Sequence, residues 1–174
     1  DLWSKCIPFF KICDSYFKTL LPKKYTNQKT ITQKLQNQKN QTSDSQCVIS
    51  DTCFSTATVN YGWRTALHKD QGDYHDGFGC MAIIDDYLNP IKYTGCYFSY
   101  PQYNIAIDVQ AGDLLFMDVH KWHCNTEYKT HIKDFEPQTK HERHNRKYCL
   151  KYGLISRISI ISYLREKIAN NIKN

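Results

Sequence analysis

The sequence lacks the features that mark several familiar classes of protein. Its eight cysteines include no CxxC pair, so a zinc site is poorly supported. It contains no apolar run long enough to cross a membrane, no signal-peptide pattern and no internal repeat, which argues against membrane, secreted and solenoid proteins. The chain begins with Asp1 and not with Met, so we expect an excised or processed piece.

The composition is that of one globular domain. The 174 residues are 41% hydrophobic and 14% aromatic, which is enough for one proper core but not comfortably for two. The net charge of +6 permits a polyanionic partner but fits ordinary solubility equally well. Several of the scattered cysteines fall in apolar runs, where thiols act as small hydrophobes, so we expect a reducing, intracellular setting.

The first 46 residues are expected to form a helical support segment, followed by a β-rich core. Apolar residues at helical spacing predict a helix over 2–21, which Pro8 interrupts, and 23–46 reads as a weakly amphipathic helix or a linker. Apolar and alternating runs predict strands at 48–49, 54–61, 66–70, 79–84, 92–99, 105–109, 114–119 and 155–163, and a closing helix at 164–172.

Many short strands with turn signals between them indicate a mainly β chain with flanking helices (α+β). We expect a double-stranded β-helix, a cupin-like jelly roll, over 47–174, with 1–46 covering one sheet and a single domain overall. Within the roll, 127–151 is a polar insertion with seven Lys and Arg against four acids. It can contact phosphates, fold over a site as a lid, or form a solvated loop.

Two residues on one expected strand, His68 and Asp70, suggest a metal site. Side chains two residues apart on a strand point to the same face, so an imidazole and a carboxylate project together. They supply two groups of the 2-His-1-carboxylate triad, which holds Fe(II) and leaves positions free for a co-substrate and oxygen. The third ligand is His120 or His123. We choose His123, because it opens a loop just past a strand and can turn inward.

Arg157 inserts a permanent cation into an otherwise apolar strand. An unpaired buried charge is very costly, so the guanidinium needs an anion. The distal carboxylate of 2-oxoglutarate satisfies it by bidentate pairing, and Ser159 adds a hydroxyl on the same face. The alternative is a structural ion pair with Asp108 or Asp118. The alternation that aligns Ser159 with Arg157 favours the co-substrate.

The sequence resembles the TET/JBP family in three blocks, which occur in this order: 63–73 (WRTALHKDQGD), 112–126 (GDLLFMDVHKWHCNT) and 157–165 (RISIISYLR). The resemblance extends over roughly 54–166. Members of this family are Fe(II)- and 2-oxoglutarate-dependent oxygenases that oxidise the methyl group of 5-methylpyrimidines in nucleic acid, and compact forms occur in large DNA viruses, phages and protists. The resemblance implies that the protein uses Fe(II), 2-oxoglutarate and O2, and ascorbate is expected to stimulate the reaction. It also implies that the protein acts inside a cell, in a nucleus or in the cytoplasm of a host cell.

The resemblance also implies roles for individual residues. The matched metal ligands and catalytic residues are His68, Asp70 and His123, and the matched co-substrate clamp is Arg157 and Ser159, to which we add Asn60. The expected substrate contacts are Asp73, Arg165, Tyr163, Asn125 and Trp63.

The substrate positions depart from the family pattern. Asp73 and Arg165 stand where TET enzymes carry Asn and His, and Cys124 follows the histidine where small members carry Gly. Asp73 can accept and Arg165 can donate hydrogen bonds, a pair that fits thymine and cytosine alike. Each also has an ordinary role, as a turn-capping carboxylate and as a solvated cation at a helix start. Trp63 and Trp122 can stack on a base, although core packing is the more ordinary role.

The expected function is therefore oxidation of the 5-methyl group of 5-methylcytosine or thymine in DNA by an Fe(II)/2-oxoglutarate-dependent dioxygenase. An alternative with the same iron site is a protein or peptide hydroxylase of the prolyl type. A third reading, without catalysis, is a jelly-roll binding module that keeps a metal-like pocket. Oligomeric state is not determined by these patterns.

Overall fold

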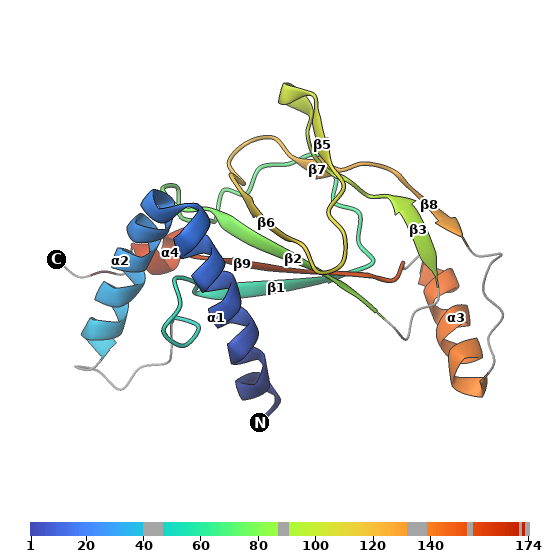
Figure 1. The fold of residues 1–174 in the computed structure, drawn as a ribbon, viewed down its shortest axis with the longest axis horizontal. Helices are drawn as coiled ribbons and strands as arrows, with labels where there is room; N and C mark the ends of the chain where they lie inside the picture. Colours follow the sequence, from blue (N-terminus) through green and yellow to red (C-terminus); the bar gives the residue numbers. More distant parts are fainter. Residues whose placement is uncertain (40–46, 87–90, 132–138, 153–154, 171, 173–174) are drawn as a thin grey trace.

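A four-stranded antiparallel sheet forms the middle layer of the fold (Figure 1). The computed structural model describes residues 1–39, 47–86, 91–131, 139–152, 155–170 and 172. The sheet runs in the order β1 (Thr56–Tyr61), β9 (Arg157–Tyr163), β2 (Gly79–Asp85) and β6 (Leu114–Met117). Because successive side chains on a strand point to opposite faces, each strand contributes to two separate cores.

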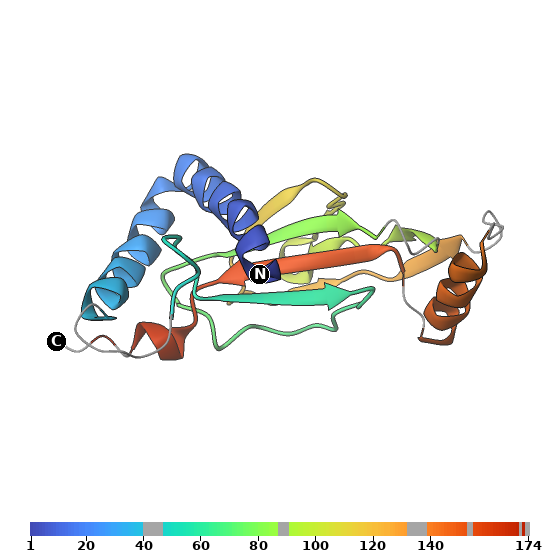
Figure 2. The ribbon, with the colours of Figure 1, turned by 90° about the horizontal axis from the view of Figure 1, so that it is seen from below.

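Helices cover one face of this sheet, as expected for the N-terminal segment. α1 (Leu2–Leu20) lies against the sheet, and α2 (Pro22–Lys39) leads away past one end toward α4 (Glu166–Ala169) (Figures 1 and 2). α1 is continuous through Pro8, and the expected interruption there is wrong. Pro8 is exposed, and the helix is held by the core contacts of its opposite face. Gln28 of α2 is buried and donates to the Cys53 carbonyl at 3.0 Å, which ties α2 to the core.

Phe17 of α1 is the centre of the core under the helices. It is fully buried, and its ring centroid lies 5.1 Å from that of Phe116 and 6.3 Å from that of Phe54. We expect Phe17→Ala to lower the free energy of unfolding by about 3–5 kcal/mol, because it removes buried area and leaves a cavity. Urea denaturation followed by circular dichroism measures this. Tyr16→Ala, at a 53% exposed neighbour, should change stability by no more than about 0.5 kcal/mol; equal losses in both variants would contradict this assignment of the core.

A second layer of short strands faces the other side of the sheet. It consists of a three-stranded sheet in the order β5 (Ile105–Ile107), β4 (Phe98–Tyr100) and β7 (Cys124–Asn125), and of the pair β3 (Lys92–Gly95) and β8 (Tyr128–His131). Met81, Ile83 and Met117 of the main sheet pack against Phe98 in a core between the layers. This arrangement of helices and antiparallel strands confirms the expected jelly roll with N-terminal helices.

Several expected strands are shorter than predicted or absent. Residues 48–49 form a bend, and 66–70 has no strand but a single bridge at His68. The run 92–99 divides into β3 and β4 because Cys96 takes a positive φ of 59°, which turns the chain. The closing helix is limited to α4, and 124–125 and 128–131 form strands that were not predicted.

The region 127–151 is not the loop that its polarity suggests. It contains β8 and α3 (Lys140–Tyr152), which lies beside β3 and β8 at the end of the fold remote from α2 (Figure 1). α3 buries Cys149 against Ile91 and Ile155, a contact that the polar composition of the segment does not reveal. Residues 40–46 of the expected support segment and 132–138 of this region lie outside the described residues. Within the described residues, no helix is long and apolar enough to span a membrane.

Candidate active site

Two segments distant in sequence run side by side and carry the candidate metal ligands. The amide of His68 donates to the carbonyl of His123 at 3.0 Å, and the amide of His123 donates back to His68 at 3.0 Å. Two residues on, the amide of Asp70 donates to the Val119 carbonyl at 2.9 Å. These bonds hold 68–70 extended although no full strand forms, so the alternation that sends His68 and Asp70 to one side persists.

The side chains of His68, Asp70 and His123 converge on one point. Their ligand atoms all lie within 4.8 Å of one another. The Asp70 Oδ1 atom is 3.2 Å from Nε2 of His68, and Oδ2 is 3.8 Å from Nε2 of His123. His120, the alternative third ligand, is not part of this group. Two imidazoles and one carboxylate are the donor set of non-haem Fe(II) sites, so these residues fit that ion.

Both histidines are oriented by a backbone carbonyl two residues earlier. Nδ1 of His68 lies 2.8 Å from the Ala66 carbonyl, and Nδ1 of His123 lies 2.9 Å from the Lys121 carbonyl. A carbonyl accepts only from N–H, so each ring carries its proton on Nδ1 and turns the lone pair of Nε2 toward Asp70. Burial lowers the pKa of His123, which keeps its imidazole neutral as metal binding requires.

A cavity of about 200 Å³ opens beside these ligands, between the two sheets. It is lined by Thr58, Asn60, Thr65, His68, Asp70, Asp73, Met81, Phe98, Met117, His123, Cys124, Asn125, Arg157, Ser159, Ile161 and Tyr163. Four of these residues alternate along β9, from Arg157 to Tyr163. Six residues of strand span about 20 Å, so the two ends of β9 offer separate binding regions within one cavity.

Arg157 forms the cationic end of the cavity. Its side chain is 3% exposed, and its Nε and Nη2 atoms are buried without a hydrogen-bond partner among the described residues. Neither Asp108 nor Asp118, the alternative partners, forms an ion pair with it in the described part of the chain. Buried donors of this kind fit a carboxylate of a bound co-substrate. Ser159 is buried on the same face, and Asn60 is its partner across β1 and β9.

Asp73 and Tyr163 line the opposite end of the cavity. Asp73 is buried, and this burial, together with the nearby charge of Asp70, raises the pKa of its carboxyl to about 7 although Arg165 opposes the shift. Asp73 and Arg165 are joined by a backbone bridge, which brings the two expected base contacts together. The Tyr163 hydroxyl lies 3.5 Å from the Thr58 hydroxyl.

The remaining residues that the sequence predicts to contact the substrate lie outside the cavity or are hydrogen-bonded to the backbone. Arg165 and Trp63 are exposed and do not line the cavity. Asn125 lines it, but its amide is engaged with the backbone: Oδ1 accepts from the Thr65 amide at 3.3 Å, and Nδ2 donates to the Cys96 carbonyl at 3.4 Å. Through these hydrogen bonds, Asn125 helps to hold the segment around Thr65 over the cavity.

The raised pKa of Asp73 predicts a pH-dependent stability. Between pH 4 and 7 the unfolded chain releases the proton that the folded carboxyl keeps, so this group's contribution to stability is lost as pH rises and levels off above 7. The full difference amounts to roughly 4 kcal/mol. We expect Asp73→Asn to match the wild type near pH 4 and to be the more stable protein at pH 8, measured by urea denaturation in EDTA. Parallel pH profiles for the two proteins would contradict this.

Several cavity residues were not anticipated from the sequence. Thr58 lies two residues before Asn60 on β1, so strand alternation alone indicates it. The sequence pattern does not indicate Thr65 and Cys124 as cavity residues, because the segments that contain them are held in place by the second layer of strands. Phe98 packs its ring 5.5 Å from that of His123 and was hidden in a run predicted as one unbroken strand.

Comparison with known proteins identifies relatives whose family agrees with this donor set. Residues 1–166 match the family model Tet_JBP, described as the oxygenase domain of the 2OGFeDO superfamily. The chain is 32% identical over 124 residues to the bifunctional helicase and thymine dioxygenase JBP2 of Trypanosoma cruzi, and 35% identical over 118 residues to that of Trypanosoma brucei brucei. These matches cover 71% and 68% of this chain and 9% of each relative. It is also 38% identical over 74 residues to the thymine dioxygenase JBP1 of Trypanosoma brucei brucei, covering 42% of this chain and 8% of that protein.

Proposed function

The chain belongs to the Tet/JBP family of oxygenase domains in the 2OGFeDO superfamily, and from this premise we propose that it oxidises the 5-methyl group of a pyrimidine in DNA. The observation that carries the proposal is one cavity that contains a group of two histidines and an aspartate together with a buried guanidinium, whose Nε and Nη2 atoms have no partner among the described residues. The thymine dioxygenase activity named for the relatives supports thymine as the base, with 5-methylcytosine as the other candidate.

In this proposal His68, Asp70 and His123 hold Fe(II), which when bound supplies the activation of O2 for attack on a C–H bond. Arg157, with Ser159 and Asn60, holds the distal carboxylate of 2-oxoglutarate and so fixes the orientation of the co-substrate relative to the metal ligands. Two ligands come from one extended segment and the third from its paired neighbour, so the site is rigid before the co-substrate arrives.

The apolar side chains of the cavity exclude water from the reaction. Met81, Phe98 and Met117 reach into it from both sheets, and Ile161 lies between Arg157 and Tyr163 on β9. A base in a duplex must leave the stack to reach this cavity. Asp73 and Tyr163 then face the base. A carboxyl with a pKa of about 7 can offer both a donor and an acceptor, which suits either pyrimidine.

The proposal is tested by mass spectrometry of nucleosides. Purified protein is incubated with Fe(II), 2-oxoglutarate and ascorbate, which we propose as a stimulant, and with oligonucleotides containing thymine or 5-methylcytosine. We expect a hydroxymethyl product from at least one base, with succinate released in equal amount. Oxidation of peptides in a total-protein digest without change in either oligonucleotide would favour the prolyl-type hydroxylase instead. If no substrate gives succinate, the remaining interpretation is a binding module without catalytic activity.

We propose the domain organisation that the sequence predicts. Residues 1–46 support the sheet, and 47–174 form the oxygenase core, in which the cavity lies. None of the described residues that line the cavity comes from helix α3. An enzyme acting on DNA works inside a cell, and we propose an intracellular location on that ground.

A further inference from the structure

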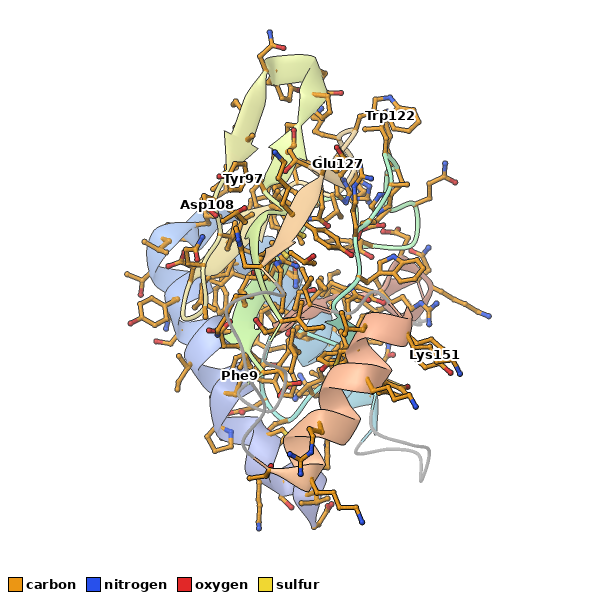
Figure 3. The ribbon with its side chains drawn as sticks, turned by 90° about the vertical axis from the view of Figure 1, so that its right-hand side faces the viewer. Phe9, Tyr97, Asp108, Trp122, Glu127 and Lys151 are labelled. Carbon is orange, nitrogen blue, oxygen red and sulfur yellow. The ribbon has the colours of Figure 1, made fainter. Side chains whose placement is uncertain are left out.

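Both tryptophans that flank the candidate metal ligands are on the surface, although core packing is their more ordinary role. Trp63 is 65% exposed and Trp122 is 46% exposed. Trp122 projects on the side of the molecule away from α1 (Figure 3). Together with three further exposed residues of the same two segments they form what we call the tryptophan face: Trp63, Leu67, Lys69, Lys121 and Trp122.

The tryptophan face belongs to the same two segments as the candidate metal ligands. Leu67 and Lys69 adjoin His68, and Lys121 and Trp122 immediately precede His123. The reciprocal backbone bonds between His68 and His123 place these two segments side by side. From residue 63 to residue 69 an extended chain spans at most about 20 Å, the length of about six base steps of one strand. A strand bound along this face therefore lies against the two segments that carry the candidate metal ligands.

The chemistry of the face combines positive charge with exposed aromatic rings. The Nζ atom of Lys69 lies 5.1 Å from the ring centroid of Trp122, a cation–π contact that presents charge and ring together. Neither Lys69 nor Lys121 forms an ion pair within the described residues. An exposed lysine suits a phosphate, and an indole suits the face of a base.

We propose that the tryptophan face binds the nucleic-acid strand that flanks the base in the cavity, with Trp122 stacking on a neighbouring base and Lys69 and Lys121 contacting phosphates. The inference rests on the proposed function for the identity of the substrate. A second copy of this positively charged chain would bring like charges together at the face, which disfavours self-association as the explanation for its exposure.

The first test measures binding of a fluorescein-labelled single-stranded oligonucleotide by anisotropy, in EDTA so that no turnover occurs. We expect Trp122→Ala to weaken binding about 5-fold to 150-fold, the range for losing one base–aromatic stack, and Trp122→Phe to retain most of the affinity. We expect Lys69→Ala and Lys121→Ala each to reduce the slope of log affinity against log salt by about 1. The matched controls lie on α1: Trp3→Ala, at a 49% exposed tryptophan, and Lys18→Ala.

The second test uses the intrinsic fluorescence of the three tryptophans, which are Trp3, Trp63 and Trp122. Replacing two of them by Phe leaves a single reporter in each variant. We expect the same oligonucleotide to quench Trp122 strongly and to leave Trp3 unchanged. Affinity within twofold of wild type for Trp122→Ala, or equal quenching of Trp3 and Trp122, would overturn the proposal. So would a wild-type dimer that Trp122→Ala converts to monomers.

These results separate this inference from the proposed function. If the protein oxidises DNA while Trp122→Ala and Lys69→Ala bind it normally, only the tryptophan face is wrongly assigned. If those variants lose binding while the wild type oxidises no base, the face stands and the proposed reaction fails.

Discussion

Replacing His123 by alanine is expected to remove Fe(II) binding and with it nearly all turnover of 2-oxoglutarate. His123 is 4% exposed, and its Nε2 atom faces the same carboxylate as that of His68. Changes to groups that merely orient metal ligands cost 10- to 100-fold, so loss of a ligand itself should cost about 10³-fold or more. Titration with Co(II) or Fe(II), followed by absorption spectroscopy, measures binding without relying on activity.

The matched control is His120→Ala, at the other histidine that the sequence offers as third ligand. His120 is outside the group formed by His68, Asp70 and His123, so we expect its variant to bind metal and to turn over within a few-fold of wild type. A reversed pattern, with His120→Ala losing the metal and His123→Ala keeping it, would show that the converging side chains are not the ligands. Circular dichroism checks that both variants fold.

Replacing Arg157 by methionine should have two opposite effects. In the absence of co-substrate the guanidinium is buried, and its Nε and Nη2 atoms have no partner in the described part of the chain, so an apolar side chain of similar length removes a desolvation cost. We expect the metal-free variant to be equally stable or more stable, by about 1–4 kcal/mol. For a chain of this size each kcal/mol raises the melting temperature by about 2–4 °C.

The same substitution should weaken 2-oxoglutarate binding by about 100-fold or more, because a buried carboxylate then lacks its counter-charge. The measurements are the KM for 2-oxoglutarate and the melting temperature with and without it. Wild type should gain stability from the co-substrate, and Arg157→Met should not. Arg143→Met, at an exposed arginine of α3, is the control for loss of one positive charge. A destabilised Arg157→Met with unchanged KM would instead indicate a structural ion pair.

Strand periodicity explains why much of the site could be predicted. On β9 the residues Arg157, Ser159, Ile161 and Tyr163 all line the cavity, as period-two alternation requires. The pair His68 and Asp70 converges for a related reason, although the predicted strand is absent. Its backbone is held extended by two hydrogen bonds with His123 and one with Val119, and an extended backbone is all that alternation needs.

The weaker predictions concern segments whose form depends on distant partners. In the polar stretch 127–151, Cys149 of α3 packs on Ile91 and Ile155, a contact that no pattern of polar residues reveals. Similarly, β7 has only two residues, and it exists because β4 lies beside it. Trp63 and Trp122 are residue types that usually pack in a core, and only the structure shows that both are exposed.

The amino-acid sequence by itself determined the class of fold, the donor types for a metal and the cation in an apolar strand, because these follow from local periodicity and from the chemistry of single side chains. Only the tertiary structure decided which histidine joins His68 and Asp70, and that the Arg157 guanidinium is left without a partner among the described residues. The physical reason is that the convergence of the ligand side chains and the burial of Arg157 depend on pairing between segments about 50 or more residues apart. The sequence of either segment alone does not show that the chain between them closes into a loop.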